Sequence, residues 1–434
     1  MNVLFVHNNF PAQFLHIAQA LIQDPEIKVA AIGSPTARPL LGMQLLKYDM
    51  GRLDVSATHP FARRFDVECH RAEQVLYCLS SLKASGFLPD VIVSHPGWGE
   101  SLPLRAVFPA AHIIAYCEFY YGLNGRDVRF DPEFPAMGTD GDVLVQIKNA
   151  ASLLALSDCD LGISPTDWQK STFPREYLNK IEVVHEGINV DVAVPNPNAE
   201  FTLPNGRKVT IQDEVVTYVT RNMEPLRGCH IFFRSLPRIL AKRPNAQVII
   251  VGGDGTSYGA PAPNGKTWKS IFFDEIKNDI DVSRVHFTGT LPYDQYLKVL
   301  QISAVHIYLT YPFVTSWSLV EALSAGCLVI GSDTAPVREV IDGTNGILVP
   351  FFDKDLLAQR VIEVLADRPK YAALRVKARE TVLERFDMMR LCMPRLRQLI
   401  IGRSEQSASN LAEPAKPPRK VARSIARAVK RTPK

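Results

Sequence analysis

Short apolar runs alternate with amphipathic stretches along most of the chain. The runs are rich in β-branched residues and apolar at successive positions, which is typical of strands buried on both faces of a parallel sheet. Helical patterns such as AQFLHIAQALI, residues 12–22, lie between them. The alternation predicts two doubly wound α/β domains, each built on a parallel sheet. The predicted strands form a first series (3–7, 28–34, 90–95, 112–119, 160–165, 181–187) and a second series (215–220, 246–253, 284–290, 305–310, 327–333, 346–350).

The segments that join and follow the two series have a different composition. Residues 194–208 are rich in Pro and Asn without periodicity, which predicts an interdomain linker. A long helical pattern covers 368–399, and from residue 401 onward the chain is polar and contains Pro, which predicts disorder. Within that tail, RKVARSIARAVKR is a weakly amphipathic basic helix. We expect a first domain over 1–192, a second over 193–385, a C-terminal helix over 386–400 that packs back on the first domain, and a disordered basic tail over 401–434.

Composition narrows the class of protein. The 434 residues contain neither a run of about 18 apolar residues nor a secretion signal, so we expect a soluble cytoplasmic protein. The seven cysteines are scattered without CxxC or Cys/His spacing, which indicates reduced core thiols and neither a disulfide framework nor a zinc site. The tail carries nine basic and two acidic residues, a net charge of +7, so residues 1–400 carry −3 of the total of +4. The body therefore does not suggest nucleic-acid binding, and binding to a polyanion would belong to the tail.

In open parallel sheets, ligands bind at the carboxyl ends of the strands. The strand 215–220 is followed by RNMEPLRG, in which Arg221 and Arg227 either neutralise a diphosphate or are solvated surface residues. The next strand ends in VGGDGTSYG, where Gly252 and Gly253 allow close approach of the backbone to a ligand. This loop lacks the GxGxxG spacing, and the chain has no Walker A loop, which weighs against a dehydrogenase and a nucleoside triphosphatase.

The stretch PFVTSWSLVEALSAGC, residues 312–327, follows the strand 305–310. Glu321 lies three positions after Ser318 at the start of a predicted helix, a spacing that fits a capping box. Glu321 is therefore either a helix cap or a ligand-binding carboxylate, and the stretch alone does not separate the two.

The ordered motifs of the second domain resemble those of the family 4 retaining glycosyltransferases, which have the GT-B fold. That family carries a Glu, seven residues and a second Glu, then a strand ending in Ser-Asp and a later NGxLV segment, and here the run is FVTSWSLVEALSAGCLVIGSDTAPVREVIDGTNGILVP. RNMEPLRG looks like the family's Arg and Lys-Gly segment, and the resemblance covers about 215–365, with a weaker match through DLGISP and VVHEGINVD. It implies two Rossmann-like domains that face each other across a cleft.

The resemblance also implies roles for individual residues. Glu321 matches the Glu that binds the donor's ribose hydroxyls, and Arg221 and Arg227 match the basic residues on the diphosphate. The backbone of Thr315, Ser316 and Trp317 would face the sugar and the β-phosphate.

The sequence departs from the family at three places. Phe313 stands where the family's first Glu contacts the transferred sugar. The first loop, HNNFPAQF, lacks the usual glycine pair, so Asn8, Asn9 or the backbone of Ala12 would reach a phosphate instead. Glu118 replaces a frequent His, and our hypothesis is that it supplies the carboxylate function missing at Phe313; the alternative is a structural ion pair.

Further residues near the first domain's strand ends are candidates for the acceptor side. His95 contacts the sugar or the acceptor, or else is structural, and the aromatic loop 119–134 is the expected acceptor-side element. The DxD pairs 140/142 and 158/160 are explained by helix caps and turns, so no obligatory metal or other cofactor is expected.

The resemblance thus implies a retaining, hexosyltransferase-like enzyme that moves a sugar from a UDP or GDP donor to a hydroxyl of a glycan or lipid-linked acceptor, as in polysaccharide biosynthesis. A catalytically silent protein that binds sugar nucleotides or glycans is the alternative, favoured by Phe313. The basic tail suggests loose attachment to an anionic membrane at its cytoplasmic face, or serves only solubility. Nucleic acid is not an expected partner.

Overall fold

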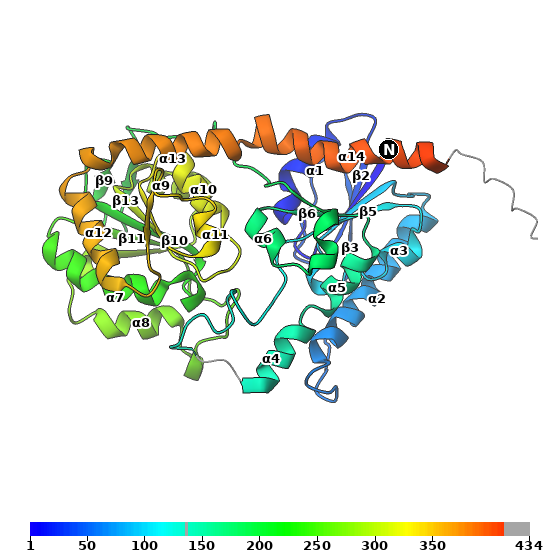
Figure 1. The fold of residues 1–434 in the computed structure, drawn as a ribbon, viewed down its shortest axis with the longest axis horizontal. Coiled ribbons are helices and arrows are strands. Elements are labelled where there is room, and N and C mark those ends of the chain that lie inside the picture. The colour runs from blue at the N-terminus through cyan, green and yellow to red at the C-terminus, as the bar shows by residue number, and fades with distance from the viewer. Residues whose placement is uncertain (135–137, 412–434) are drawn as a thin grey trace, which may run out of the picture.

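The computed structural model describes residues 1–134 and 138–411, with side chains as far as residue 402. Two α/β lobes lie side by side (Figure 1). The first lobe contains a seven-stranded parallel sheet in the order β3-β2-β1-β4-β5-β6-β7. Its strands are β1 (Asn2–Val6), β2 (Lys28–Gly33), β3 (Gln44–Lys47), β4 (Val91–Ser94), β5 (His112–Tyr116), β6 (Leu161–Ser164) and β7 (Ile181–Val183). Its helices are α1 (Leu15–Ile22), α2 (Arg63–Ala84), α3 (Leu104–Val107), α4 (Gly138–Ile147), α5 (Ala150–Asp158) and α6 (Asp167–Ser171).

The second lobe contains a six-stranded parallel sheet in the order β12-β11-β10-β13-β14-β15. Its strands are β10 (Val215–Asn222), β11 (Gln247–Gly253), β12 (Val285–Gly289), β13 (Val305–Tyr308), β14 (Val329–Ser332) and β15 (Ile347–Val349). Its helices are α7 (Cys229–Lys242), α8 (Trp268–Ile276), α9 (Tyr293–Gln301), α10 (Trp317–Ser324), α11 (Ala335–Arg338), α12 (Lys354–Ala366) and α13 (Ala372–Arg385). Both sheets are buried on two faces, as their continuous apolar runs predict, and the predicted pair of doubly wound domains is confirmed.

One local prediction was wrong. The expected linker 194–208 contains most of an antiparallel hairpin, β8 (Glu200–Thr202) and β9 (Lys208–Thr210), because Phe201 and Val209 are buried against the second lobe. The helical pattern predicted over 368–399 forms α13 and the start of the last helix, with a π-helical segment, η8 (Met388–Cys392), between them. At this interruption Gly187 packs against Met388, and a Cβ at residue 187 would lie 2.5 Å from the Met388 Cα atom.

The last helix, α14 (Met393–Leu411), runs along the first lobe (Figure 1). Leu396, Leu399 and Ile400 join the apolar core of that lobe, and Arg397 forms an ion pair with Asp24 beside α1. The helix extends into the region that the sequence analysis assigned to the tail. Residues 412–434, which include the basic segment expected at a membrane, lie outside the described residues.

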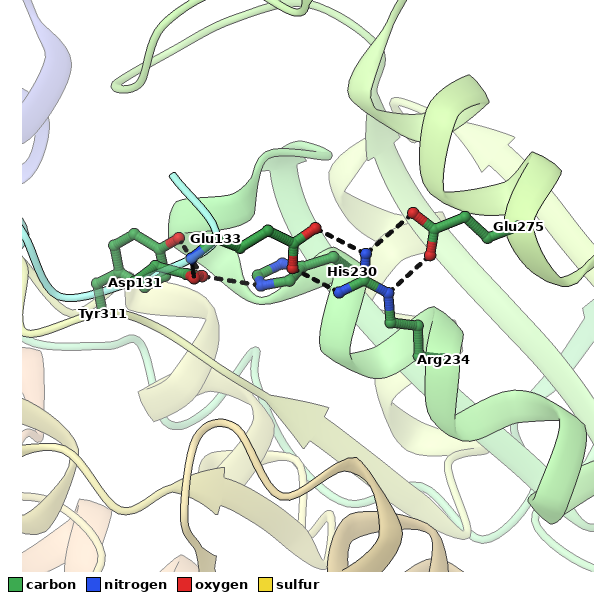
Figure 2. Close-up of polar contacts among 6 residues, drawn as sticks. All are labelled: Asp131, Glu133, His230, Arg234, Glu275 and Tyr311. Atoms are coloured by element: carbon green, nitrogen blue, oxygen red, sulfur yellow. Dashed lines mark hydrogen bonds and ion pairs between the residues drawn. The ribbon is translucent and has the colours of Figure 1, made fainter. Parts of the chain in front are cut away.

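The segment 119–134 leaves the first lobe after β5 and packs against the second lobe. The Phe130 ring lies 5.0 Å from the ring of Tyr311 and 5.3 Å from that of Phe351. Asp131 accepts hydrogen bonds from His230 Nε2 at 2.9 Å and from Tyr311 Oη at 2.6 Å, as Figure 2 shows. The second half of the segment expected on the acceptor side is therefore part of the contact between the lobes.

Candidate active site between the two lobes

The carboxyl ends of both sheets line a first cavity of about 340 Å³. The first lobe contributes Ala12, Gln13, Glu118 and Glu186, and the second contributes the ends of β10 and β13 with the start of α10. This is the position at which parallel α/β sheets bind ligands, and here two sheets meet at one cavity.

Arg221 and Arg227 both line the first cavity, but they differ in burial and in hydrogen bonding. Arg227 is buried, and its Nη1 donates to Thr310 Oγ1 and to the Val314 carbonyl, each at 3.0 Å. Arg221 is exposed, and among the described residues no hydrogen bond or ion pair engages its guanidinium. Arg227 is therefore a fixed cation, whereas Arg221 keeps all its donors for a ligand.

The N-terminus of α10 also faces the first cavity through Thr315, Ser316 and Trp317. Ser316 is the N-cap, and its hydroxyl accepts from the Ser318 N–H at 3.2 Å, so the capping box that the spacing of Ser318 and Glu321 allowed is not formed. Within the described part of the chain, the peptide N–H groups of Thr315 and Trp317 have no acceptor. The helix terminus thus offers donors and a positive dipole end to an anion.

Glu321 lies one turn into α10 and is 8% exposed. Its two carboxylate oxygens accept from Tyr293 Oη at 2.8 Å and Tyr296 Oη at 2.7 Å. Burial raises the pKa of Glu321, although the two tyrosine hydrogen bonds oppose this. Neither tyrosine was among the predicted site residues; their only signal in the sequence is a spacing of three at the start of a helix that follows a strand end.

Tyr296 connects Glu321 to a third cavity of about 390 Å³, which is lined by the ends of β10, β11 and β12. Gly252 lines this cavity, whereas Gly253 does not. Both glycines are needed for packing of neighbouring strand ends: a Cβ at residue 252 would lie 2.4 Å from the Thr220 carbonyl oxygen, and one at residue 253 would lie 2.5 Å from Asn222 Oδ1. Gly252 also has φ of +148°, a conformation that favours glycine.

Glu118 and His95 interact on the opposite wall. His95 Nδ1 accepts from the Gly97 N–H at 3.1 Å, so the Nε2–H is the donor to Glu118 Oε2 at 3.2 Å. Gln13 Nε2 donates to the other Glu118 oxygen at 3.1 Å. Burial acts to raise the pKa of Glu118, but the His95 and Gln13 hydrogen bonds outweigh it and the pKa is lowered. Glu118 is thus held as a carboxylate at the cavity wall.

Glu118 also lines a second cavity of about 490 Å³, together with His95, Asn8, Asn9 and Phe313. Asn8 and Asn9 therefore lie on the second cavity, whereas Ala12 lies on the first. Tyr116, Glu118, Arg221 and Tyr258 line both cavities and form their junction.

Phe313 is 4% exposed and packs between the lobes. Its ring lies 4.8 Å from the ring of Phe119 in the first lobe and 5.2 Å from that of Tyr258. The Arg227 guanidinium lies 5.8 Å from the Phe313 ring. The position that the family fills with a carboxylate is here part of an aromatic contact, and Glu118 lies on the same cavity.

Glu186 is a second carboxylate at the first cavity that the sequence analysis did not single out. Trp317 Nε1 donates to its Oε2 at 3.2 Å, whereas its Oε1 is buried without a hydrogen bond among the described residues. Burial raises the pKa of Glu186 to about 7. The residue lies three positions after the end of β7, and this place near a strand end is the signal that could have found it.

Asp131, Glu133 and His230 place ligand-type atoms within 4.8 Å of one another. Arg234 donates to both Glu133 oxygens, at 2.6 and 2.8 Å, and also pairs with Glu275, as Figure 2 shows. A guanidinium thus already binds the Glu133 carboxylate, and the cluster is an ion-pair network between the lobes. Of the DxD residues, Asp160 accepts from the Ile113 N–H and Arg105, and Asp142 pairs with Arg129.

Two sequence families match the chain in succession. "Glycosyl transferase family 4 group" covers residues 25–193, and "Glycosyl transferases group 1" covers residues 206–381. The chain belongs to the family 4 glycosyltransferases. The resemblance inferred from the sequence and the GT-B fold are confirmed.

Among known proteins, this family 4 chain is 28% identical over 182 residues to the phosphatidyl-myo-inositol mannosyltransferase of Mycolicibacterium smegmatis, an alignment of 41% of the chain and 42% of the relative. It therefore spans less than half the length of that relative. The GDP-mannose-dependent alpha-(1-6)-phosphatidylinositol monomannoside mannosyltransferase of the same organism is 23% identical, over 71% of the chain and 76% of the relative.

Solved structures show the same fold at low identity. The sucrose-phosphate synthase of Thermosynechococcus elongatus has a TM-score of 0.71 and 17% identity, covering 94% of this chain and 100% of the other. Anabaena HepE in complex with UDP and glucose has a TM-score of 0.61 and 16% identity, covering 95% and 100%. Over the described residues of this family 4 chain, none of the helices combines the length and apolarity needed to cross a bilayer.

Proposed function

We propose that the protein transfers a sugar from a nucleoside diphosphate donor, UDP or GDP, to an acceptor hydroxyl with retention of anomeric configuration. The observation that carries this is the first cavity, where Arg221, Arg227 and the N-terminus of α10 face Glu118 across the gap between the lobes. Two cations and unpaired N–H groups suit a diphosphate, including the charge that develops on it as it leaves. The name of the GDP-mannose-dependent relative supports a sugar-nucleotide donor.

The donor's nucleoside would occupy the third cavity, with its ribose against Glu321. The two tyrosine hydroxyls now on Glu321 mark the positions that ribose hydroxyls would share or take over, since a carboxylate has about four acceptor sites. The sugar would then lie at the junction of the first and second cavities, beside Glu118, Arg221 and Tyr258.

At this junction the acceptor hydroxyl would attack the anomeric carbon on the same face as the departing diphosphate. Arg221 and Arg227 stabilise the diphosphate as the bond to the sugar breaks, and a diphosphate oxygen takes the acceptor's proton. Glu118, held ionised by His95 and Gln13, orients the sugar through its hydroxyls. The acceptor is a glycan or a lipid-linked molecule, and the basic tail would hold the protein near an anionic membrane.

Purified protein incubated with labelled UDP- and GDP-sugars and candidate acceptors tests this proposal. We expect donor hydrolysis or transfer that is lost in Arg227→Met. Glu118→Gln should lower turnover without lowering donor affinity, and full transfer activity in that variant would refute the role of Glu118.

A sugar-nucleotide-binding protein without activity is the second candidate, because Phe313 replaces a carboxylate with an apolar ring. Donor binding with neither transfer nor hydrolysis across the whole panel would favour this candidate.

A further inference from the structure

Two of the cations that line the second cavity have no role in the proposed sugar transfer. Its walls include Arg64 from α2, Lys148 from the turn between α4 and α5, and Arg221 from the second lobe, against the single carboxylate of Glu118. Asn8, Asn9 and Ser152 add neutral polar groups to the same walls. A cavity of about 490 Å³ with three cations and one anion favours a polar, negatively charged ligand.

Lys148 carries its charge on a half-buried side chain. Its ammonium lies 3.4 Å from the centre of the Tyr121 ring, and no hydrogen bond or ion pair within the described residues reaches it. Burial, together with the charge of Arg64, lowers the pKa of Lys148 to about 8, although Asp127 and Glu68 act in the opposite direction. A half-buried ammonium next to another cation is unfavourable on its own and is stabilised by a bound anion.

Arg64 is held in place but not neutralised on its cavity side. Its Nε lies 2.9 Å from Glu68 Oε1, and its Nη2 donates to the Gly97 carbonyl at 3.2 Å. Gly97 follows His95 in the loop that lines the second cavity. Among the described contacts none engages Arg64 Nη1, so a donor remains for a ligand.

We propose that the second cavity binds the acceptor and that Lys148 and Arg64 hold a phosphate group on it. This inference rests on the proposed function and names the acceptor class: a phosphate-bearing molecule whose hydroxyl reaches the junction at Glu118. An arginine fork and a lysine point charge together match the several oxygens of a phosphate. Because α2 and the α4–α5 turn both belong to the first lobe, this phosphate site is separate from the diphosphate site formed by Arg227 and α10.

The test uses the full chain in saturating UDP or GDP, whichever raises the melting temperature more, so that the donor site is filled. Calorimetric titration with glucose 6-phosphate is compared with glucose, and titration with short-chain phosphatidylglycerol below its micellar concentration is compared with glycerol. We expect at least one phosphorylated probe to bind about tenfold or more tightly than its neutral counterpart, and this preference to fall to about twofold in Lys148→Gln with Arg64→Gln. Binding of the lipid alone assigns a lipid-linked acceptor, and binding of the sugar phosphate assigns a soluble one.

Lys148→Gln is the primary variant because its ammonium has no hydrogen-bond partner in the described structure to lose. The matched controls are Arg63→Gln and Lys28→Gln. Arg63 is the neighbouring arginine on α2 and bonds the Thr58 and Ser56 carbonyls, and Lys28 is exposed at the amino end of β2. These should keep the preference within about twofold of the unmodified chain, since they do not line the cavity.

Equal affinity for phosphorylated and neutral probes, or a preference that persists in the double variant, would overturn the inference. An unchanged nucleotide-induced thermal shift shows that each variant is folded with an intact donor site. If the unmodified chain binds no nucleotide, the proposed function fails. The titration without nucleotide then still tests the phosphate site through the same variants.

Discussion

Replacing Asp131 with Ala removes the acceptor for two buried side-chain donors at the contact between the lobes, and for the Glu133 N–H, which donates to Asp131 Oδ1 at 2.9 Å. His230 is fully buried and Tyr311 nearly so, and both donate to Asp131 Oδ2 (Figure 2). Burial acts to raise the pKa of Asp131, but the hydrogen bonds from His230 and Tyr311 outweigh it, so the pKa is lowered and the group is a carboxylate. The substitution therefore removes charge-assisted hydrogen bonds between buried side chains.

The expected cost follows from the number of donors left unsatisfied. Each buried group left without a partner costs about 1 to 3 kcal/mol, so the two together give about 3 kcal/mol after local relaxation. Since 1.36 kcal/mol corresponds to a factor of ten, opening of the segment 119–134 should become roughly a hundredfold more frequent.

Hydrogen exchange measures this opening directly. The Phe130 N–H donates to the Asp127 carbonyl and the Phe134 N–H to the Asp131 carbonyl, so both amides report on the segment. Glu133→Ala is the matched control, because Glu133 is exposed and Arg234 keeps Glu275, so exchange should rise less than about tenfold. Unchanged exchange at Phe130 and Phe134 in Asp131→Ala would refute the reasoning, as would equal acceleration throughout β10.

Three further predictions concern the donor side. Glu321→Ala should weaken UDP or GDP binding about tenfold or more by calorimetry, because the ribose loses a carboxylate acceptor; equal affinity would exclude a ribose contact. Arg227→Met should reduce the ratio of diphosphate to monophosphate affinity, and an unchanged ratio would place the diphosphate elsewhere. Burial raises the pKa of Glu186 from its ordinary value of 4.5 to about 7 in the folded state, so Glu186 is neutral below that pH. Its protonation therefore stabilises the folded state fully below about pH 4.5, and this contribution to the free energy of unfolding is lost as the pH rises to about 7. Nucleotide affinity should fall as the pH rises through 7 because a carboxylate forms beside the diphosphate, and Glu186→Gln should flatten both dependences, measured by denaturant unfolding and titration.

The main strands were predictable because a parallel strand buried on both faces must be apolar throughout, and such runs stand out in the sequence. The strand β3 was not predicted, because it is an edge strand of four residues with half-buried or exposed side chains. The hairpin β8–β9 was missed for a similar reason: each strand has three residues, and one residue in each is buried.

The residues of the candidate site were likewise predictable only where they lie near the ends of buried strands. Arg221 lies at the end of β10, and Glu118, Arg227 and Ser316 lie in the loops that follow β5, β10 and β13. Because the strand ends of a parallel sheet converge on one edge, sequence order indicates their proximity. Lys148 comes from a turn between two helices, and nothing local brings it to the same cavity as Asn8. Likewise Tyr293 and Tyr296 reach Glu321 only through the packing of α9 beside α10.

The position of Glu118 depends on both lobes. Gln13 and His95 hold its carboxylate from the first lobe, whereas the chain that follows it crosses to the second lobe, where Phe119 packs on Phe313 and Asp131 is bound by His230. A rotation of one lobe against the other therefore pulls on the residue next to Glu118. Because Arg227 moves with the second lobe, the distance between the sugar-orienting carboxylate and the diphosphate-binding cation is set by this crossing segment. Loosening it in Asp131→Ala should consequently lower the transfer rate more than nucleotide affinity, although Asp131 lines neither cavity.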